Sequence, residues 1–431
     1  MSVLNAMYSG VSGLDAESSA LGVIGDNVSN SNTVGFKESR AMFEDVMGAA
    51  VGSPDAVGAG VKMASVQQDF SQGSMTTTGQ PTDLALSGDG FFVVSGSVGG
   101  VTGNYYTRDG QTKINATGQL VNSDGLALQG YSALPNGQMS STLGPIQLGT
   151  TPLAPKPTST MTIAANLSAS APVAAAWDPQ NPTTTSNFST SMTVYDSLGD
   201  AHTADVYFRN TGPNAWEYHA VANGSEVQGG TAGQNFEFAS GTMTFNSNGA
   251  LQSVTPTGGQ ISFNGAAAQT INFNLGTPIT PSGTGAAGTG LDGVTQFGSA
   301  SSVSAQSQDG FASGSLSSIS VGADGTVSGV YSNGQSLAVG QLAIAKFASN
   351  QGLARTGNNL LEATQLSGTP ALGAAGSGGR GSLVSGSLEQ SNVDIATQFV
   401  DLIAHQRAFQ ADSKTITTAD DMLQSLLQVV Q

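Results

Sequence analysis

Apolar residues recur at helical spacing only near the two ends of the chain. Near the N-terminus one apolar column repeats every seven positions and a shorter column runs beside it. The residues of these columns are Met7, Leu14, Leu21 and Val28, with Leu4 and Val11. The pattern predicts an amphipathic helix over about 3–29 with a narrow apolar seam. Its four glycines each cost about 1 kcal/mol of helix propensity, so the helix should need a packing partner.

The C-terminal pattern is longer and more regular. Ser391 is predicted to be the N-cap, with Asp394 at the third helical position. Phe399 widens the apolar stripe that follows. The column at spacing seven consists of Ile395, Leu402, Phe409, Ile416, Leu423 and Val430. A helix of about 37 residues is predicted, ~55 Å long at the usual rise per residue.

The long middle of the chain has the pattern of β-structure. Alternating apolar runs such as 191–195 and 204–208 predict strands. Asn-Gly and Asp-Gly pairs predict tight turns between them. No convincing helix is expected between about 70 and 385, and loose stretches near 150–160, 276–290 and 368–381 indicate boundaries.

Two interpretations of the end helices remain open. They could be core helices of one globular domain, or they could be surfaces that other copies of the chain cover. Each has only a narrow seam, and a large β region separates them in the sequence. This arrangement favours assembly through coiled-coil-like packing.

Composition narrows the possible partners. The 431 residues carry a net charge of -17, and only 10% are charged, against a usual ~25%. Such a chain repels nucleic acid and anionic membrane surfaces, so neither is an expected partner. The absence of Cys excludes disulfides and thiolate metal sites. No apolar run is long enough to cross a membrane, and the N-terminus lacks the pattern of a cleavable secretory signal.

Candidate catalytic chemistry is sparse. Gly88-Asp89-Gly90 lacks the third glycine of a dinucleotide loop and precedes a strand, so a turn is the better interpretation. His202 and His219 have no third ligand type nearby. We therefore expect no catalytic, cofactor or metal site and no enzyme. A secreted β-rich hydrolase remains an alternative, which would need carboxylates clustered in a cleft.

The ends of the chain resemble the flagellar rod and hook family of axial proteins. Segment 26–37 is similar to the N-terminal signature of that family, although Asp26 and Ser29 stand where the family has Asn and Ala. Segments 391–394 and 406–411 resemble its C-terminal motifs, with Phe409 in place of a usual Tyr. The matching residues are Asn27, Asn30, Thr33, Gly35, Phe36, Lys37, Asn392, Asp394, Gln406 and Arg407. Segments 83–92 and 331–356 also resemble the family's core strands.

Within this family, rod proteins are short, whereas here about 150–300 is an insertion. The resemblance therefore implies a hook subunit that polymerises into a curved, flexible tube and acts as a universal joint between rod and filament. It implies a flagellar, extracellular location reached without a cleavable signal. The implied partners are other copies, the distal rod protein, the hook cap, the hook–filament junction protein and the flagellar type III export apparatus. A distal rod-type protein or a surface-layer-like subunit is the alternative.

The expected architecture is multidomain, with each domain inserted within the preceding one. An inner helical, coiled-coil-like polymerisation domain is expected from 1–30 and 388–431. Linking segments are expected at 31–71 and 373–387. A discontinuous β core is expected from 72–150 and 306–372, and an inserted outer β domain from 151–305.

Overall fold

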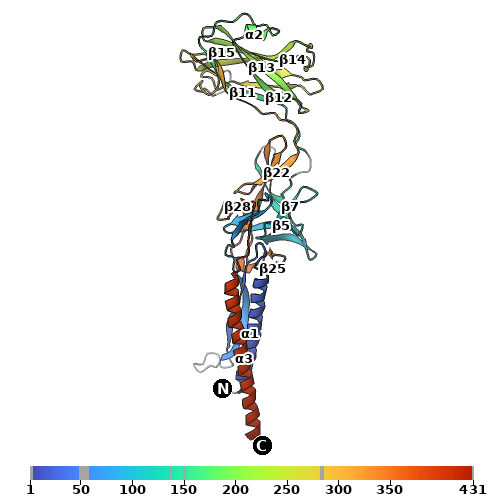
Figure 1. Ribbon diagram of the computed structural model, residues 1–431, viewed down its shortest axis with the longest axis vertical. Helices are drawn as coiled ribbons and strands as arrows, with labels where there is room; N and C mark the ends of the chain where they lie inside the picture. Colours follow the sequence, from blue (N-terminus) through green and yellow to red (C-terminus); the bar gives the residue numbers. More distant parts are fainter. Residues whose placement is uncertain (1–2, 48–57, 135–136, 149–151, 282–285, 430–431) are drawn as a thin grey trace. The chain divides into compact units, whose positions relative to one another are not determined.

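The computed structural model describes residues 3–47, 58–134, 137–148, 152–281 and 286–429. The chain forms two compact units (Figure 1). The first comprises 1–150, 317–330 and 336–431, and the second comprises 151–316 and 331–335. The chain thus leaves the first unit, builds the second and returns.

Two antiparallel helices from opposite ends of the chain lie side by side in the first unit (Figure 1). They are α1 (Val3–Ser29) and α3 (Ile395–Val429), close to the ranges that the apolar periodicity predicts. The glycines of α1 allow their close approach. A Cβ on Gly10 would lie 2.9 Å from Ile416 Cγ1, and one on Gly13 would clash with the Asp412 carboxylate. These glycines weaken the helix but also create its contact face.

A β-hairpin runs along α1. It lies within 31–71, which the sequence predicted to be a linking segment. It consists of β1 (Ser39–Met47) and β2 (Gly58–Gln68). Gly60 has φ +108° and approaches Ser12 closely, and the Ser12 hydroxyl accepts a hydrogen bond from Val61 N at 3.2 Å. An isolated hairpin is only marginally stable, so α1 provides the surface that this one needs.

A 12-stranded sheet forms the core of the first unit. Its main path runs through β22 (Leu316–Val321), β23 (Thr326–Tyr331), β24 (Ser336–Lys346), β9 (Ala127–Ala133), β5 (Phe91–Val98), β6 (Val101–Thr107), β26 (Leu360–Glu362) and β25 (Ala354–Gly357). The strands β10 (Met139–Pro145), β27 (Ala371–Ala374), β7 (Thr112–Ile114) and β8 (Leu120–Asn122) join its sides, and the 3-10 turn η1 is Asn350–Gly352. Phe91, Tyr106 and Phe347 pack edge to face inside it.

Two short strand pairs lead the chain back toward α3. β28 (Ser382–Ser385) pairs with β4 (Leu84–Ser87), and β29 (Ser387–Glu389) pairs with β3 (Met75–Thr77). The segment 373–387, which the sequence suggested was a second link, therefore contributes strands to the first unit. The partners of β28 and β29 lie about 300 residues earlier in the sequence.

The second unit packs two sheets around one apolar core. An antiparallel meander runs through β12 (Phe188–Tyr195), β13 (Ala201–Gly212), β14 (Ala215–Asn223), β15 (Asn235–Phe245) and β16 (Leu251–Gly258). The second sheet has β11 (Thr160–Ser168) bonded to β19 (Asn272–Asn274), β20 (Thr295–Phe297) and β21 (Ser302–Gln308). A two-stranded pair of β17 (Gln260–Ile261) and β18 (Gln269–Thr270) and the one-turn helix α2 (Pro182–Thr185) complete it. Alternate residues of β11 and of the meander strands fill the core between them.

Phe208→Ala should destabilise the second unit alone, because Phe208 is fully buried in its core. The expected loss is about 3–5 kcal/mol in the free energy of unfolding of that unit. Both tryptophans of the chain, Trp177 and Trp216, lie in the second unit, so tryptophan fluorescence reports its unfolding. Helical circular dichroism reports the first unit. Leu291→Ala, at an exposed residue, is the control; a shift of the helical transition by Phe208→Ala would contradict independent cores.

Candidate assembly surface and the junction that supports it

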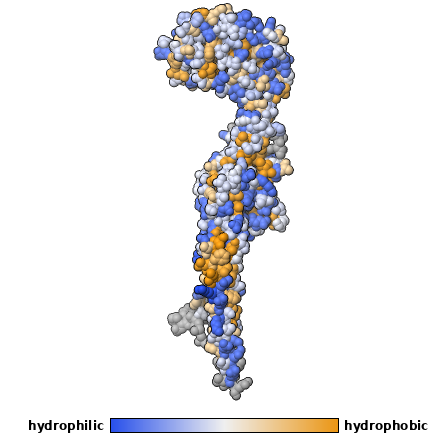
Figure 2. Space-filling view, in the orientation of Figure 1, coloured by the Kyte–Doolittle hydropathy of each residue, from blue (hydrophilic) through white to orange (hydrophobic). Residues whose placement is uncertain are grey.

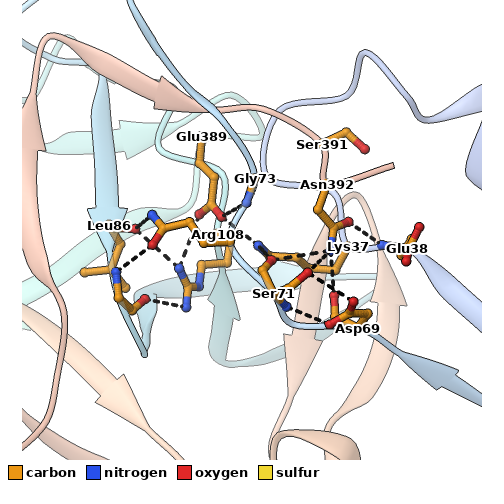
Figure 3. A network of polar contacts seen from close by, with 12 residues as sticks. Lys37, Glu38, Asp69, Ser71, Gly73, Leu86, Arg108, Glu389, Ser391 and Asn392 are labelled. Carbon is orange, nitrogen blue, oxygen red and sulfur yellow. Dashed lines mark hydrogen bonds and ion pairs between the residues drawn. The ribbon is translucent and has the colours of Figure 1, made fainter. Parts of the chain in front are cut away.

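Three buried charges join distant segments where the helices meet the core (Figure 3). Lys37 Nζ lies 2.6 Å from Glu389 Oε1, and Arg108 Nη1 lies 3.2 Å from Glu389 Oε2. Lys37 is 4% exposed, Arg108 5% and Glu389 0%. The cluster joins the segment after α1, the end of β6 and β29. It therefore connects the N-terminal part of the first unit to the segment that returns toward α3.

Backbone groups add hydrogen bonds to this cluster, in which the buried Arg108 Nε is the one side-chain nitrogen without a hydrogen-bond partner among the described residues. Glu389 Oε1 also accepts from Gly73 N at 3.0 Å, Lys37 donates to Ser71 O at 2.6 Å, and Arg108 Nη2 donates to Gly88 O at 2.8 Å. Burial lowers the pKa of both Lys37 and Arg108, and the negative charge of Glu389 acts in the opposite direction. A buried ion cluster is favourable only when its geometry satisfies each charge in this way.

Two motif asparagines fasten the helices to the base of the hairpin. Asn27 Oδ1 accepts from Ser39 N at 2.8 Å, and its Nδ2 donates to Ser39 O at 2.7 Å and to Gln398 Oε1 at 3.0 Å. Asn392 Oδ1 accepts from Glu38 N at 2.8 Å (Figure 3). An amide can donate and accept at once, which these paired contacts require. Asn27 and Asn392, which belong to the family motifs, therefore connect both ends of the chain to the segment at the start of β1.

The rest of the N-terminal motif builds a turn against the same junction. Gly35 has φ +69°, and a Cβ there would lie 2.6 Å from Asp109 N, so only glycine fits. Its N–H donates to the Glu389 carbonyl at 2.8 Å. Thr33 Oγ1 donates to Asn30 Oδ1 at 3.1 Å, and the buried ring of Phe36 lies 5.8 Å from the Arg355 guanidinium.

The prediction of Ser391 as the N-cap of the C-terminal helix is wrong. Asp394 directly precedes the first helical residue, and its Oδ1 accepts from Ala396 N at 2.8 Å and Thr397 N at 3.3 Å. The Ser391 hydroxyl instead accepts from Val393 N at 3.3 Å, outside the helix. Asp394 therefore satisfies the first free N–H groups of α3.

Arg108 and Glu389 were not singled out by the sequence analysis. Neither belongs to a periodic apolar pattern, and 281 residues separate them. The available signal was weak: Glu389 is an acid in a short strand just before the motif at 391–394. Only the fold shows that it neutralises a motif lysine.

The expected apolar seam lies beside the buried face of α1, whereas on α3 only Leu402, Ile416 and Leu423 of the described seam residues share the face that packs on α1. The buried residues of α1 are mostly small and recur at spacings of three and four: Gly10, Gly13, Ala16, Ala20, Ile24 and Asn27. The half-buried seam residues are Met7, Leu14, Leu21, Val28, Leu402, Ile416 and Leu423. The exposed ones are Val11, Ile395, Phe399 and Phe409. The Leu4 side chain and Val430 lie outside the described residues.

A patch of large apolar side chains is uncovered on the first turns of α3. Ile395, Phe399 and Ile403 recur every four residues and are 45%, 51% and 49% exposed, and neighbouring Val400 is 66% exposed. Figure 2 shows apolar colour gathered over this part of the helix. An uncovered patch of this kind marks an interaction surface. The motif residues Gln406 and Arg407 are exposed just beyond it.

The other candidate sites have structural explanations. Gly88 and Gly90 take φ of +102° and +128° in the turn before β5, as the turn interpretation predicts. His202 contacts Glu226 and Asp196, whereas His219 contacts Glu237 and stacks on Trp177. Among the described residues, no three His, Asp or Glu side chains are placed so that they could hold a metal ion together. Among the helices that the structure describes, none could span a membrane.

A hollow of about 450 Å³ beside the junction contains a perturbed carboxyl group. Its lining includes Phe36, Arg108, Asp109, Asp124 and Arg355. Burial raises the pKa of Asp109 to about 6, and the nearby charges of Asp124 and Asp83 act in the same direction. Protonation of Asp109 should therefore stabilise the folded first unit.

Domain models of flagellar axial proteins match most of the chain. The model described as "Flagella basal body rod protein" matches 7–37, and "Flagellar hook protein FlgE/F/G D1 domain" matches 85–166. "Flagellar basal body protein FlaE D2 domain" matches 164–311, and "Flagellar basal body rod FlgEFG protein C-terminal" matches 384–429. The models that match 7–37 and 384–429 cover most of α1, all described residues of α3 and most of the motifs at the junction.

Flagellar hook proteins of similar length match this chain over almost its whole length. The flagellar hook protein FlgE of Salmonella typhimurium is 39% identical over 97% of this chain and 98% of its own length. That of Escherichia coli is 37% identical over 98% of this chain and 100% of its own. The crystal structure of Helicobacter pylori flagellar hook protein FlgE2 covers 73% of this chain and all of its own, with a TM-score of 0.52 at 16% identity. This last likeness concerns the fold alone.

Glu389→Gln should lower the free energy of unfolding of the first unit by about 3–5 kcal/mol. The change removes the negative charge and leaves Lys37 and Arg108 buried as two uncompensated cations. Denaturant unfolding followed by helical circular dichroism measures the loss. Glu362→Gln, at an exposed strand residue, is the matched control. An equally small effect of both changes would show that the cluster does not hold the unit together.

Asp109→Asn should remove a pH dependence of the first unit. The folded pKa of about 6 lies above the ordinary 3.8, so the stabilisation is complete below about pH 4 and is lost as pH rises through 6. The unmodified chain should lose about 2–3 kcal/mol of unfolding free energy relative to Asp109→Asn between about pH 4 and 7. Parallel denaturant titrations at several pH values measure this difference. The same slope in both proteins would contradict the assignment, and Asp89→Asn is the exposed control.

Proposed function

The chain belongs to the flagellar hook protein family and is a structural subunit of the hook, and from this premise we propose that its copies assemble through their helical ends into a curved, flexible helical tube. The tube transmits torque from the rod to the filament as a universal joint. The observation that carries the proposal is the uncovered apolar patch of Ile395, Phe399, Val400 and Ile403 on α3. A second copy that covers this patch removes it from water.

The two faces of α1 support different roles: the face of small residues packs within the chain, and the face of larger residues is available for assembly. Small residues such as Gly13 and Ala16 pack within the chain, whereas the bulkier seam is half-buried or exposed. A pair of helices has too little core to be rigid alone, so packing against other pairs stabilises it. Assembly in this way is coiled-coil-like and stabilises the paired helices further by mass action.

The buried junction provides the stiffness that torque transmission needs. Lys37, Arg108 and Glu389 connect the helical ends to the core sheet with several short contacts. A rotation imposed on the helices is then passed to the β core of the same copy. The second unit is rich in Thr, Ser, Asn and Gly, and weak polar contacts between such units can change as a tube bends.

The remaining partners follow from membership of the family. The tube joins the distal rod protein at one end and the hook–filament junction protein at the other, and it grows beneath a hook cap. Copies reach the growing end through the flagellar type III export apparatus. A chain without Cys and with 10% charged residues is compatible with passage in an unfolded form and with an extracellular location.

Phe399→Asp should block tube formation and leave the isolated chain folded. Its side chain is 51% exposed, so the new charge stays in water in a single chain but would be buried in a packed tube. Sedimentation and negative-stain images measure assembly, and the two melting signals measure folding. Leu198→Asp adds the same charge at a 61% exposed leucine of the second unit and is the matched control. Normal tubes from folded Phe399→Asp would overturn the proposed surface.

A further inference from the structure

A second surface lies on the later turns of α3. It is a groove of about 400 Å³ with mostly apolar walls. On α3 it is lined by the small side chains of Ala411, Thr415, Thr418 and Ala419, by Lys414 and by the half-exposed Met422, and Ala6 of α1 in the same copy borders it. The α3 positions recur at spacings of three and four and form one face of the helix. The small residues leave room for a bulky side chain from outside.

A surface with large protruding side chains lies on α1. Tyr8 is 70% exposed and Val11 is 51% exposed, and Asp15 is exposed four residues later. Their spacing of three and four places them on one face. This face is distinct from the small-residue face that packs on α3 of the same chain, which includes Gly13 and Ala16. The tyrosine is thus a bulky group that the described residues of its own copy leave largely exposed.

The charges of the two surfaces are complementary at Lys414, whereas Asp420 and Asp421 are exposed at the Met422 end of the groove. The acids of α1 are Asp15, Glu17 and Asp26, and the helix carries no Lys or Arg. Glu17 contacts His405, and Asp26 contacts Arg355. Among the residues that the structure describes, Asp15 and Lys414 have no ionic partner. Two α1 helices would repel each other, whereas α1 and the Lys414 side of the groove attract.

We infer that Tyr8, Val11 and Asp15 of a second copy dock in the α3 groove, with Asp15 paired to Lys414. This inference rests on the proposed polymer and names the contact that sets its register. Copies in a helical tube share one direction, so α1 of one copy runs antiparallel to α3 of its neighbour, as within a chain. Asp15 opposite Lys414 then places Val11 at Thr418 and Tyr8 beside Met422. Seven residues span about 10.5 Å on either helix. The contact of Asp15 with Lys414 and the contact of Tyr8 near Met422 can therefore form at the same time.

Charge reversal in the full-length chain tests the pairing. Asp15→Lys and Lys414→Asp should each raise the critical concentration for seeded tube growth by roughly threefold or more, because attraction becomes repulsion. The double variant should return it to within about twofold of the unmodified value. These differences should shrink as salt rises from about 0.05 M to about 0.5 M. Failure of the double variant to recover, while the unmodified chain grows, overturns the pairing.

Two further variants determine the register. Arg407→Asp tests the other exposed cation of α3, and rescue of Asp15→Lys by this change rather than by Lys414→Asp would show a different register and overturn ours. Asp401→Lys is the matched control on α3, and Asp401→Lys should not rescue Lys414→Asp. Folding of each variant is checked by the helical and tryptophan melting signals.

Cross-linking gives an independent measurement, because the chain has no Cys. Copies with Val11→Cys are mixed with copies with Thr418→Cys, assembled and oxidised. A disulfide-linked dimer of the two kinds of copy is expected, since the proposed register brings these residues together. Tubes without that dimer overturn the inference. Absence of tubes from the unmodified chain would instead contradict the proposed function, so the two failures are distinguishable.

Discussion

The first unit depends on one buried carboxylate held between two cations. Glu389 satisfies Lys37 and Arg108 at the point where the N-terminal motif, the core sheet and the returning chain meet. Removing water from three charges is costly, and their mutual contacts together with the surrounding backbone carbonyls and the Gly73 N–H offset that cost. The cluster therefore forms in one arrangement. That arrangement fixes where both end helices leave the β core.

The glycines of α1 serve the fold through their contacts rather than through helix propensity. Gly10 and Gly13 let α3 approach closely, so α1 contacts Ile416 and Asp412 of α3 through its small residues. Larger side chains such as Met7 and Val11 are left partly or largely free. A helix that used its bulky seam inside the chain would have little apolar surface left for other copies. Close packing within the copy thus makes assembly between copies possible.

Charges are scarce in this chain, and many of them have structural tasks. Besides the buried cluster, Asp309 is held by Ser159 and Lys156 near the start of the second unit, which keeps the pKa of its carboxyl group well below the ordinary range. Most of the remaining surface is neutral and polar. A surface of this kind avoids strong fixed contacts, which suits a subunit whose neighbours must shift as a tube bends.

Local patterns in the sequence determined the two helices, the β-rich middle and the family, because periodicity and short motifs depend on near neighbours in the chain. The tertiary structure decided what those patterns could not contain. The hairpin of β1 and β2 lies in a segment without clear alternation and is stabilised by α1. Glu389 and Arg108 are 281 residues apart, and Gly13 shows its use only opposite Asp412. Which face of α1 turns inward depends on the shape of α3, and a sequence pattern records the polarity of a face but not the surface that it meets.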